Sequence, residues 1–464
     1  PMDVISFKIK LDSSNDFILK VKNLDLNYSS DNKSRIIERS FINNEIKKDS
    51  SSHKSLQIAK ENIYYREYEK AKLNLEKLVK KDKYNIEAIY HLGELYFRSG
   101  NFNKSLDIIK RGLNIDTYNP SLNYMMGVLY KETGNYIDSK EALGWAARSI
   151  KYRSNAYSQI ADIFLIERDF KKALEYAIKS LEFNVKNIPS LEVKAIANRY
   201  LKDTLNHKIS IQSIYDIDPI NHIIPFEEYM ISPSTKHLNN VRESHRSELI
   251  NQTYLELAIK YYNKGLIREA IKILEIGPDD MLNKIWLAYL NKDIKIIDST
   301  LKKHKIDFVF PFRRETIQTL NWAKSKFNDW RLEYLLALNL YGKGRFMESI
   351  NLLSKIGEKP TNSIFYLNRG KIFEKQGINP KNDFEKAYTL DNKNWRVSRA
   401  LSKYKYDSKE FMKAYKILKE SFMNDTSNYI IGMDYVKVLL RIEKYKEAIS
   451  ILDILKILPY EHAG

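Results

Sequence analysis

A regular spacing of small residues recurs through the first half of the chain and constrains its fold more than any other feature. Ala59, Gly93, Gly127, Ala161 and Ala195 follow one another at a constant interval, since 93 − 59 = 34 and each later step is the same. Twelve positions after the first four of them lie further small residues: Ala71, Ser105, Ser139 and Ala173. Apolar residues around both positions follow helical spacing, so each unit is predicted to contain two helices.

Packing explains why such a unit recurs. Two small residues let the paired helices approach closely, and the Gly-Asn pairs at Gly100 and Gly134 suit a tight turn between them. One helix pair cannot bury its own apolar face, so neighbouring pairs stack and share a core. The sequence therefore predicts an all-α solenoid of antiparallel helix pairs.

The same residues resemble a known family. A 34-residue unit with small residues at positions 8 and 20, an aromatic residue at position 11 (Tyr96, Tyr130, Phe164) and a proline near the unit's end (Pro120, Pro189) resembles the tetratricopeptide repeat. The resemblance implies a superhelix with a concave face, and binding of proteins or peptides on that face.

The chain is predicted to contain five segments. Residues 1–28 read as a β-strand segment, since Ile5 to Leu11 alternate between apolar and polar and Phe17 to Leu26 form a second strand candidate. Residues 29–52 are rich in Ser, Asn and Lys and read as a linker. A first repeat block covers 53–201, an irregular connector with a short helix or two covers 202–250, and a second block covers 251–464. The register is expected to be lost after Ala195, and about ten helix pairs are expected in all.

Several short blocks are also similar to the repeat region of a bacterial family of unassigned function that joins a β-sandwich domain to such repeats. The blocks are Leu143–Ser149 followed by Lys151–Ser154, Pro311–Thr316, Asn394–Arg396 and Leu458–Glu461. Two alternatives are open for the strand segment: it leans on the first helices, or, as this resemblance implies, it is the stub of an upstream β domain that resembles carbohydrate-processing sandwiches. The alternative for Trp145, Trp322 and Trp395 is that they fill gaps between helices.

No sequence motif for catalysis was found. The chain has no Cys, no Gly-rich phosphate loop and no HExxH. Adjacent acidic pairs such as Glu227-Glu228 point apart on a helix and do not make an acid/base pair. His207, His222, His237 and His245 have spacings that fit no ligand motif. We therefore expect no enzyme activity from this chain, no cofactor and no metal.

The formal net charge of +18 raises the question of nucleic acid, but basic residues are spread among 59 acidic ones and form only short runs. A solvated, lysine-rich surface is favoured, and no nucleic-acid partner is expected. No apolar run is long enough to span a membrane. The sequence does not distinguish a cytoplasmic from a periplasmic protein. It also does not show whether the chain forms a homo-oligomer.

If the chain has a binding site, the family resemblance implies the concave face, which the first helix of each unit lines. Carried over by position, the candidates in the first block are Tyr90, Glu94, Phe97, Tyr124, Lys131 and Asp162, and those in the second block are Tyr334, Tyr341, Arg396, Arg399 and Lys403. The first set is mixed in charge. The second is basic and aromatic and suits an acidic partner.

Two functions follow as alternatives. The first is a non-catalytic scaffold that binds a protein or peptide through the concave face. The second is the accessory or substrate-binding half of a larger carbohydrate-acting enzyme with a β-sandwich domain.

Overall fold

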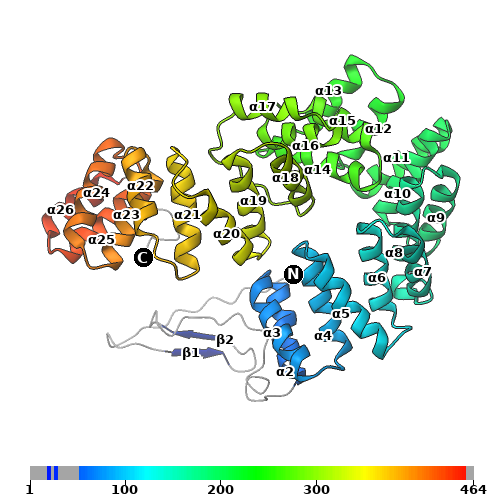
Figure 1. Cartoon of the computed structure of the whole chain (residues 1–464), viewed down its shortest axis with the longest axis horizontal. Coiled ribbons are helices and arrows are strands. Elements are labelled where there is room, and N and C mark those ends of the chain that lie inside the picture. Colours follow the sequence, from blue (N-terminus) through cyan, green and yellow to red (C-terminus); the bar gives the residue numbers. More distant parts are fainter. Residues whose placement is uncertain (1–17, 22–25, 30–51, 456–464) are drawn as a thin grey trace. The chain divides into compact units, whose positions relative to one another are not determined.

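The computed structural model describes residues 18–21, 26–29 and 52–455 of the chain. Within these residues it contains 25 helices, α2 to α26, and two short strands (Figure 1). The chain forms two compact units, Pro1–Lys83 and Tyr84–Gly464. The predicted all-α repeat architecture is confirmed: successive helices pack against each other as antiparallel pairs.

The first unit contains the two strands and one helix pair. β1 (Ile18–Val21) pairs antiparallel with β2 (Leu26–Ser29). α2 (Ser52–Tyr64) and α3 (Tyr68–Lys81) pack together with Ala59 and Ala71 fully buried. The predicted strand at Ile5–Leu11 and residues 30–51 of the predicted linker lie outside the described residues, so the β-strand segment stays a prediction.

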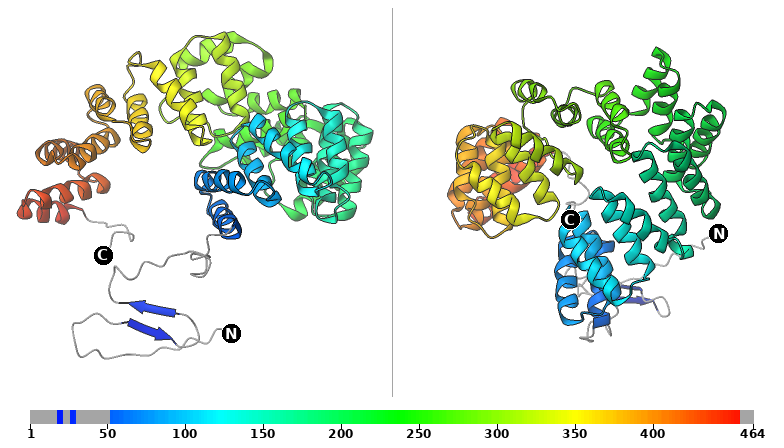
Figure 2. Two further views of the ribbon diagram at one scale, coloured as in Figure 1. Left: turned by 60° about the horizontal axis from the view of Figure 1, so that its bottom comes forward. Right: turned by 45° about the vertical axis from the view of Figure 1, so that its right-hand side comes forward.

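The second unit consists of helices throughout its described part, and Figure 2 shows them from two further sides. Their bounds are α4 (Ile86–Arg98), α5 (Phe102–Ile115), α6 (Pro120–Glu132), α7 (Tyr136–Ala146), α8 (Ile150–Ile166), α9 (Phe170–Phe183), α10 (Ile188–Tyr200), α11 (Thr204–Ile217), α12 (Ile223–Ile231), α13 (Thr235–Ser244), α14 (Ile250–Asn263), α15 (Ile267–Ile276), α16 (Met281–Asn291), α17 (Ile294–Lys303), α18 (Glu315–Lys326), α19 (Trp330–Gly342), α20 (Phe346–Ile356), α21 (Ser363–Lys375), α22 (Lys381–Leu390), α23 (Trp395–Asp407), α24 (Phe411–Asn424), α25 (Tyr429–Arg441) and α26 (Tyr445–Ile454).

The small residues hold each pair together at a close helix contact. A Cβ placed on Gly127 of α6 would lie 2.5 Å from Leu143 Cγ of α7, so only glycine fits there. The second small position adds a hydrogen bond, because Ser139 Oγ donates to the carbonyl oxygen of Gly127 at 2.6 Å. Ser105 bonds in the same way to Gly93, and Ser349 to Ala337. These serines satisfy their own hydroxyls inside the core while linking the two helices.

The turn between the two helices of a pair has a fixed backbone geometry. Gly100 and Gly134 adopt left-handed φ values of 71° and 81°, and Arg66, Arg168 and Lys202 adopt the same conformation at the equivalent positions of other pairs. His207, twelve positions after Ala195, bonds through Nδ1 to the carbonyl oxygen of Ala195 at 2.9 Å. The expectation that the register is lost after Ala195 is therefore wrong by one helix, since α11 completes a regular pair with α10. Histidine in place of a small residue hid this position in the sequence.

The middle of the chain departs most from the predicted layout. The segment 202–250, read as an irregular connector, contains α11, α12 and α13. In the described residues, 25 helices make twelve pairs and one single helix, α18, rather than about ten pairs. The short helices α12 and α13, of 9 and 10 residues, follow Pro219 and flank Pro233, which break the longer helical pattern.

Glycine substitutions test the close contact directly. We expect Gly127→Ala to destabilise the fold by about 1–3 kcal/mol, because its methyl group would overlap Leu143. Gly144 lies in the same helix pair on α7 with no atom within 4 Å of a Cβ position. Gly144→Ala should therefore stabilise the helix by about 0.5–1 kcal/mol. Urea denaturation of both variants measures the difference, and equal effects would contradict the packing described here.

A stack of aromatic rings fastens α13 to α14. The His245 ring lies 4.6 Å from His222 and 4.3 Å from Tyr254, centroid to centroid. His245 is fully buried, and its Nδ1 donates to the carbonyl oxygen of Val241 at 2.7 Å. Burial, reinforced by the neighbouring His222, lowers the pKa of His245 to about 4.

This shift predicts acid sensitivity. Below pH 6.5 the unfolded chain gains a proton on His245, whereas the folded chain keeps the ring neutral until about pH 4. Stability should therefore fall as pH drops from 6.5 to 4, by at most about 3 kcal/mol from this group. His245→Phe keeps a ring in the stack and should flatten the dependence in that window. Denaturation midpoints measured at several pH values between 4 and 6.5 test this prediction. If the midpoint of the variant fell with pH as steeply as that of the unmodified chain, His245 would not be the cause.

Candidate functional site

The predicted site residues lie on the first helices of their pairs. Those of the first block come from α4 (Tyr90, Glu94, Phe97), α6 (Tyr124, Lys131) and α8 (Asp162), and those of the second from α19 (Tyr334, Tyr341) and α23 (Arg396, Arg399, Lys403). The two sets have very different surroundings. The first faces other helices of the same chain, whereas much of the second faces solvent.

Asp162 of α8 binds two lysines. Its carboxylate lies 3.2 Å from Nζ of Lys131 on α6 and 2.5 Å from Nζ of Lys264, which follows α14. Burial alone would raise the pKa of Asp162, but Lys264 and Lys131 outweigh it and hold that pKa below its ordinary value. A Cβ on the adjacent Gly265 would lie 3.0 Å from the backbone of Ile166. The turn between α14 and α15 is thus pressed against α8.

A second contact joins the start of α18 to α4 and α6. The guanidinium of Arg314 lies 4.0 Å from the ring centroid of Phe97 and donates to Glu132 Oε1 at 2.7 Å. Next to this contact, between the start of α18, α6 and the end of α14, lies a pocket of about 280 Å³ whose lining includes Tyr136, Tyr262 and Glu315. Phe97 therefore contacts this chain's own arginine.

Tyr90, Glu94 and Tyr124 bond or stack with residues of the same block. Tyr90 Oη donates to Glu94 Oε1 at 2.8 Å, and the Tyr124 ring lies 5.5 Å from Tyr152. Burial, with Asp162 as the next cause, raises the pKa of Tyr124 to about 12.

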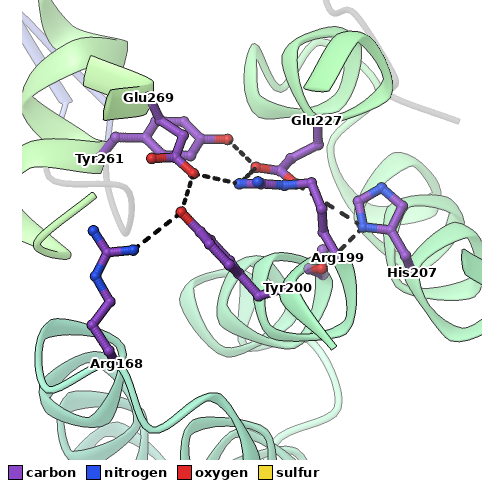
Figure 3. Close-up of polar contacts among 8 residues, drawn as sticks. Arg168, Arg199, Tyr200, His207, Glu227, Tyr261 and Glu269 are labelled. Carbon is purple, nitrogen blue, oxygen red and sulfur yellow. Dashed lines mark hydrogen bonds and ion pairs between the residues drawn. The ribbon is translucent and has the colours of Figure 1, made fainter. Parts of the chain in front are cut away.

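A buried network of charged and hydroxyl side chains connects α10 to α12, α14 and α15 (Figure 3). Arg199 donates to Glu227 of α12 at 2.7 and 3.1 Å and to Glu269 of α15 at 3.0 Å. Tyr200 and Tyr261 donate their hydroxyls to Glu269 and Glu227 at 2.5 and 2.6 Å. Burial opposes the charge of Arg199, but Glu227 outweighs it and raises its pKa. The network therefore fixes α12, α14 and α15 to α10.

Sequence reasoning missed Arg199 and its neighbour Glu192, which pairs with Lys260 at 2.7 Å. Both occupy the repeat positions that Leu165 and Ser158 hold in the preceding unit, since 199 − 165 = 34 and 192 − 158 = 34. Extending the frame by one unit would have placed them on the same face. The first block's face is thus occupied by helices and turns of the second half of the chain.

Charge removal at Asp162 should be costly. Asp162→Asn leaves the buried Lys264 without its carboxylate, and losses on the order of 3–5 kcal/mol are typical of broken buried pairs. Lys264→Met removes the ammonium while keeping a side chain of similar length. We expect the double variant to lose clearly less stability than the two single variants lose when their losses are added. Chemical denaturation in a double-mutant cycle measures this coupling, and additive losses would mean that the pair is not coupled.

In the second block, the two tyrosines differ from the basic residues. Tyr334 is only 1% exposed, and its hydroxyl accepts a hydrogen bond from Asn368 at 2.7 Å. It belongs to the core, which is at odds with a ligand-facing role. Tyr341 is half-buried beside Phe346, with 5.0 Å between ring centroids.

Five exposed cations follow one another on α21, α23 and α25 and form what we call the basic strip: Lys371, Arg396, Arg399, Lys403 and Lys437. Arg399 pairs with Asp434 at 2.7 Å, and Lys403 pairs with Asp407 at 3.0 Å and Glu374 at 3.6 Å. Five cations thus face three carboxylates. Lys437 was not predicted, although it lies one repeat after Lys403, since 437 − 403 = 34.

The strip has Lys371 at one end and a pocket at the other. Partial desolvation, and then the nearby Arg399 and Arg396, lower the pKa of Lys371, whereas Glu374 opposes this shift. At the other end lies a pocket of about 220 Å³, whose lining includes Arg399, Lys403, Tyr406 and Lys437. Such a surface can accept carboxylates through charge-assisted hydrogen bonds.

The described residues contain no group of three or more His, Asp or Glu placed to hold a metal ion. None of the helices described here combines the length and the apolar character needed to cross a membrane.

The fold and the site define an α-solenoid built from helix pairs. Residues 86–119, which span α4 and α5, match the family profile of the tetratricopeptide repeat, and the helix pairs of the chain form a solenoid of the kind that such repeats build. The resemblance to a bacterial β-sandwich-plus-repeat family stays a prediction.

Several solved structures are similar to parts of this chain. One is YrrB, described as a tetratricopeptide protein with an unusual peptide-binding site, at 17% identity and a TM-score of 0.32, covering 39% of this chain and 93% of YrrB. Another is PilW, a type IV pilus biogenesis factor, at 16% identity and a TM-score of 0.39, covering 44% and 99%. A third is PilF of Pseudomonas aeruginosa, at 15% and 0.39, covering 46% and 95%. A comparison with curated protein sequences found no match.

Proposed function

We propose that the chain is a non-catalytic interaction scaffold that binds an acidic segment of a partner protein along the basic strip. The excess of positive charge on α21, α23 and α25 carries this proposal. Repeat scaffolds commonly offer extended surfaces for such segments.

We place the binding surface in the second block because the corresponding face of the first block is already occupied by other parts of the chain. In the first block, Asp162 and Arg199 are bonded to Lys264 and Glu269 of the second half of the chain. In the second block, Arg396 and Arg399 remain exposed, and Arg396 lies over the Trp395 ring at 4.4 Å. A partner can reach these guanidinium groups without displacing a buried contact.

The alternative interpretation is that the strip is an ordinary solvated surface. Lys403–Asp407 is an i,i+4 pair of two exposed groups, which contributes little to stability. The pairs therefore do not argue against binding, because a carboxylate of a partner can replace one at small cost. Lys371 and Arg396, which supply the excess charge, are the groups that gain most from an anion.

Charge reversal tests the proposal. Arg396→Glu together with Arg399→Glu should abolish binding of a polyglutamate peptide while leaving the melting temperature nearly unchanged, because both side chains are exposed. Binding to the unmodified chain should weaken as salt rises. Fluorescence anisotropy of the labelled peptide measures both effects.

Lys386→Glu together with Lys416→Glu is the matched control. These exposed lysines lie on α22 and α24, the second helices of their pairs, and give the same change in net charge. Binding that falls equally in both double variants would point to a general effect of net charge and contradict a defined strip.

A further inference from the structure

The connection between α17 and α18, residues 304–314, exposes three phenylalanines in a row of alternating residues. Phe308, Phe310 and Phe312 are 56%, 52% and 37% exposed. Between and before them, Pro311 and Ile306 are buried. The buried residues attach the segment to the core. The exposed phenylalanines bury less apolar surface and therefore contribute less to the stability of the fold.

The segment is also fixed by hydrogen bonds on both sides of the phenylalanines. Asn362 donates to the carboxylate of Asp307 at 2.8 Å, and Asn339 donates to the carbonyl oxygen of Arg313 at 2.9 Å. Phe308 itself has a φ of 61°, a left-handed conformation that is unusual for a bulky side chain. Backbone strain of this kind is often found at binding surfaces.

Arg396 connects this segment to the basic strip. Its guanidinium lies 5.3 Å from the centroid of Phe308 and 4.4 Å from that of Trp395. One cation of the strip is thus flanked by two rings that come from distant parts of the sequence. Apolar ring surface and positive charge meet at this point.

We propose that Phe308, Trp395 and Arg396 form an aromatic anchor site that takes an aromatic side chain of the acidic segment bound along the strip. This inference rests on the proposed function and specifies its ligand: a peptide segment with carboxylates and a nearby Phe, Tyr or Trp. The carboxylates match Lys371, Arg396 and Arg399, and the partner's ring packs on Phe308.

The charge of the strip and the exposed rings together select this occupant. A purely apolar segment would leave the strip's cations unmatched, and a purely acidic one would leave the Phe308 ring in water. Clustered exposed apolar residues on a protein surface often mark an interaction site. An aromatic pair adds binding energy beyond the area it buries.

A peptide selection provides the test. Random 12-residue peptides displayed on phage are selected on the 464-residue chain, and the composition of bound peptides is compared with the starting pool. We expect enrichment of Asp and Glu together with one aromatic residue. Phe308→Gly should weaken binding of a selected peptide about fivefold. When the selection is repeated on this variant, the acidic enrichment should persist and the aromatic enrichment should disappear.

The Phe308→Gly variant separates binding from folding. Glycine accepts the φ of 61° without strain, so the melting temperature should stay the same or rise. Tyr445→Ala, which truncates a ring that is 57% exposed on α26, is the control and should leave the selected peptides unchanged.

Four results would overturn the inference. Acidic enrichment without aromatic enrichment in the unmodified chain would retain the proposed function and remove the anchor site. Absence of acidic enrichment would remove both. A large fall in the melting temperature of Phe308→Gly would assign the ring a structural role. Phe308-dependent binding of polygalacturonate oligomers in place of peptides would assign the site to an acidic glycan.

Discussion

Close approach of two helices at small residues is the constraint on which the rest of this structure depends. At Gly127 the second helix comes so near that a single methyl group would overlap Leu143, and Ser139 uses the same proximity to bond the Gly127 carbonyl. The contact sets the angle and spacing within each pair. Because the pairs repeat at a constant interval, the first helices line up on one face and present equivalent positions side by side.

The spacing also explains how much of the fold could be predicted from the sequence. The period, the helix pairs and the turns could be predicted from Gly93, Gly127 and Ala161, because small residues let the two helices of a pair approach closely. His207 shows where the reasoning fails: a large side chain can take the position of a small one if its ring nitrogen bonds the facing carbonyl. Short helices such as α12, which hold no such small-residue pair, leave no periodic signal.

The candidate site was predicted less well, for a physical reason. Position in a repeat tells which face a residue is on but not what covers that face. Asp162 and Lys131 are on the predicted face, yet their partner Lys264 lies far along the chain, 102 positions after Asp162. Tyr334 is on the predicted face and is buried all the same. Only the arrangement of distant helices decides such cases, and the period of the repeat contains no information about it.

The ion pairs of the two blocks differ because burial changes the free energy that is lost when an ion pair is broken. The side chains of Lys264 and Asp162 are 6% and 11% exposed, so removing either partner leaves a charge in a poorly solvated place. The side chains of Arg399 and Asp434 are 48% and 35% exposed, and water already solvates both partners. A competing carboxylate can therefore take over Arg399 at small cost, but it cannot take over Lys264 without opening the contact between the two halves. Burial thus makes the Lys264–Asp162 pair a structural contact, whereas the Arg399–Asp434 pair is solvated enough to exchange its carboxylate for another.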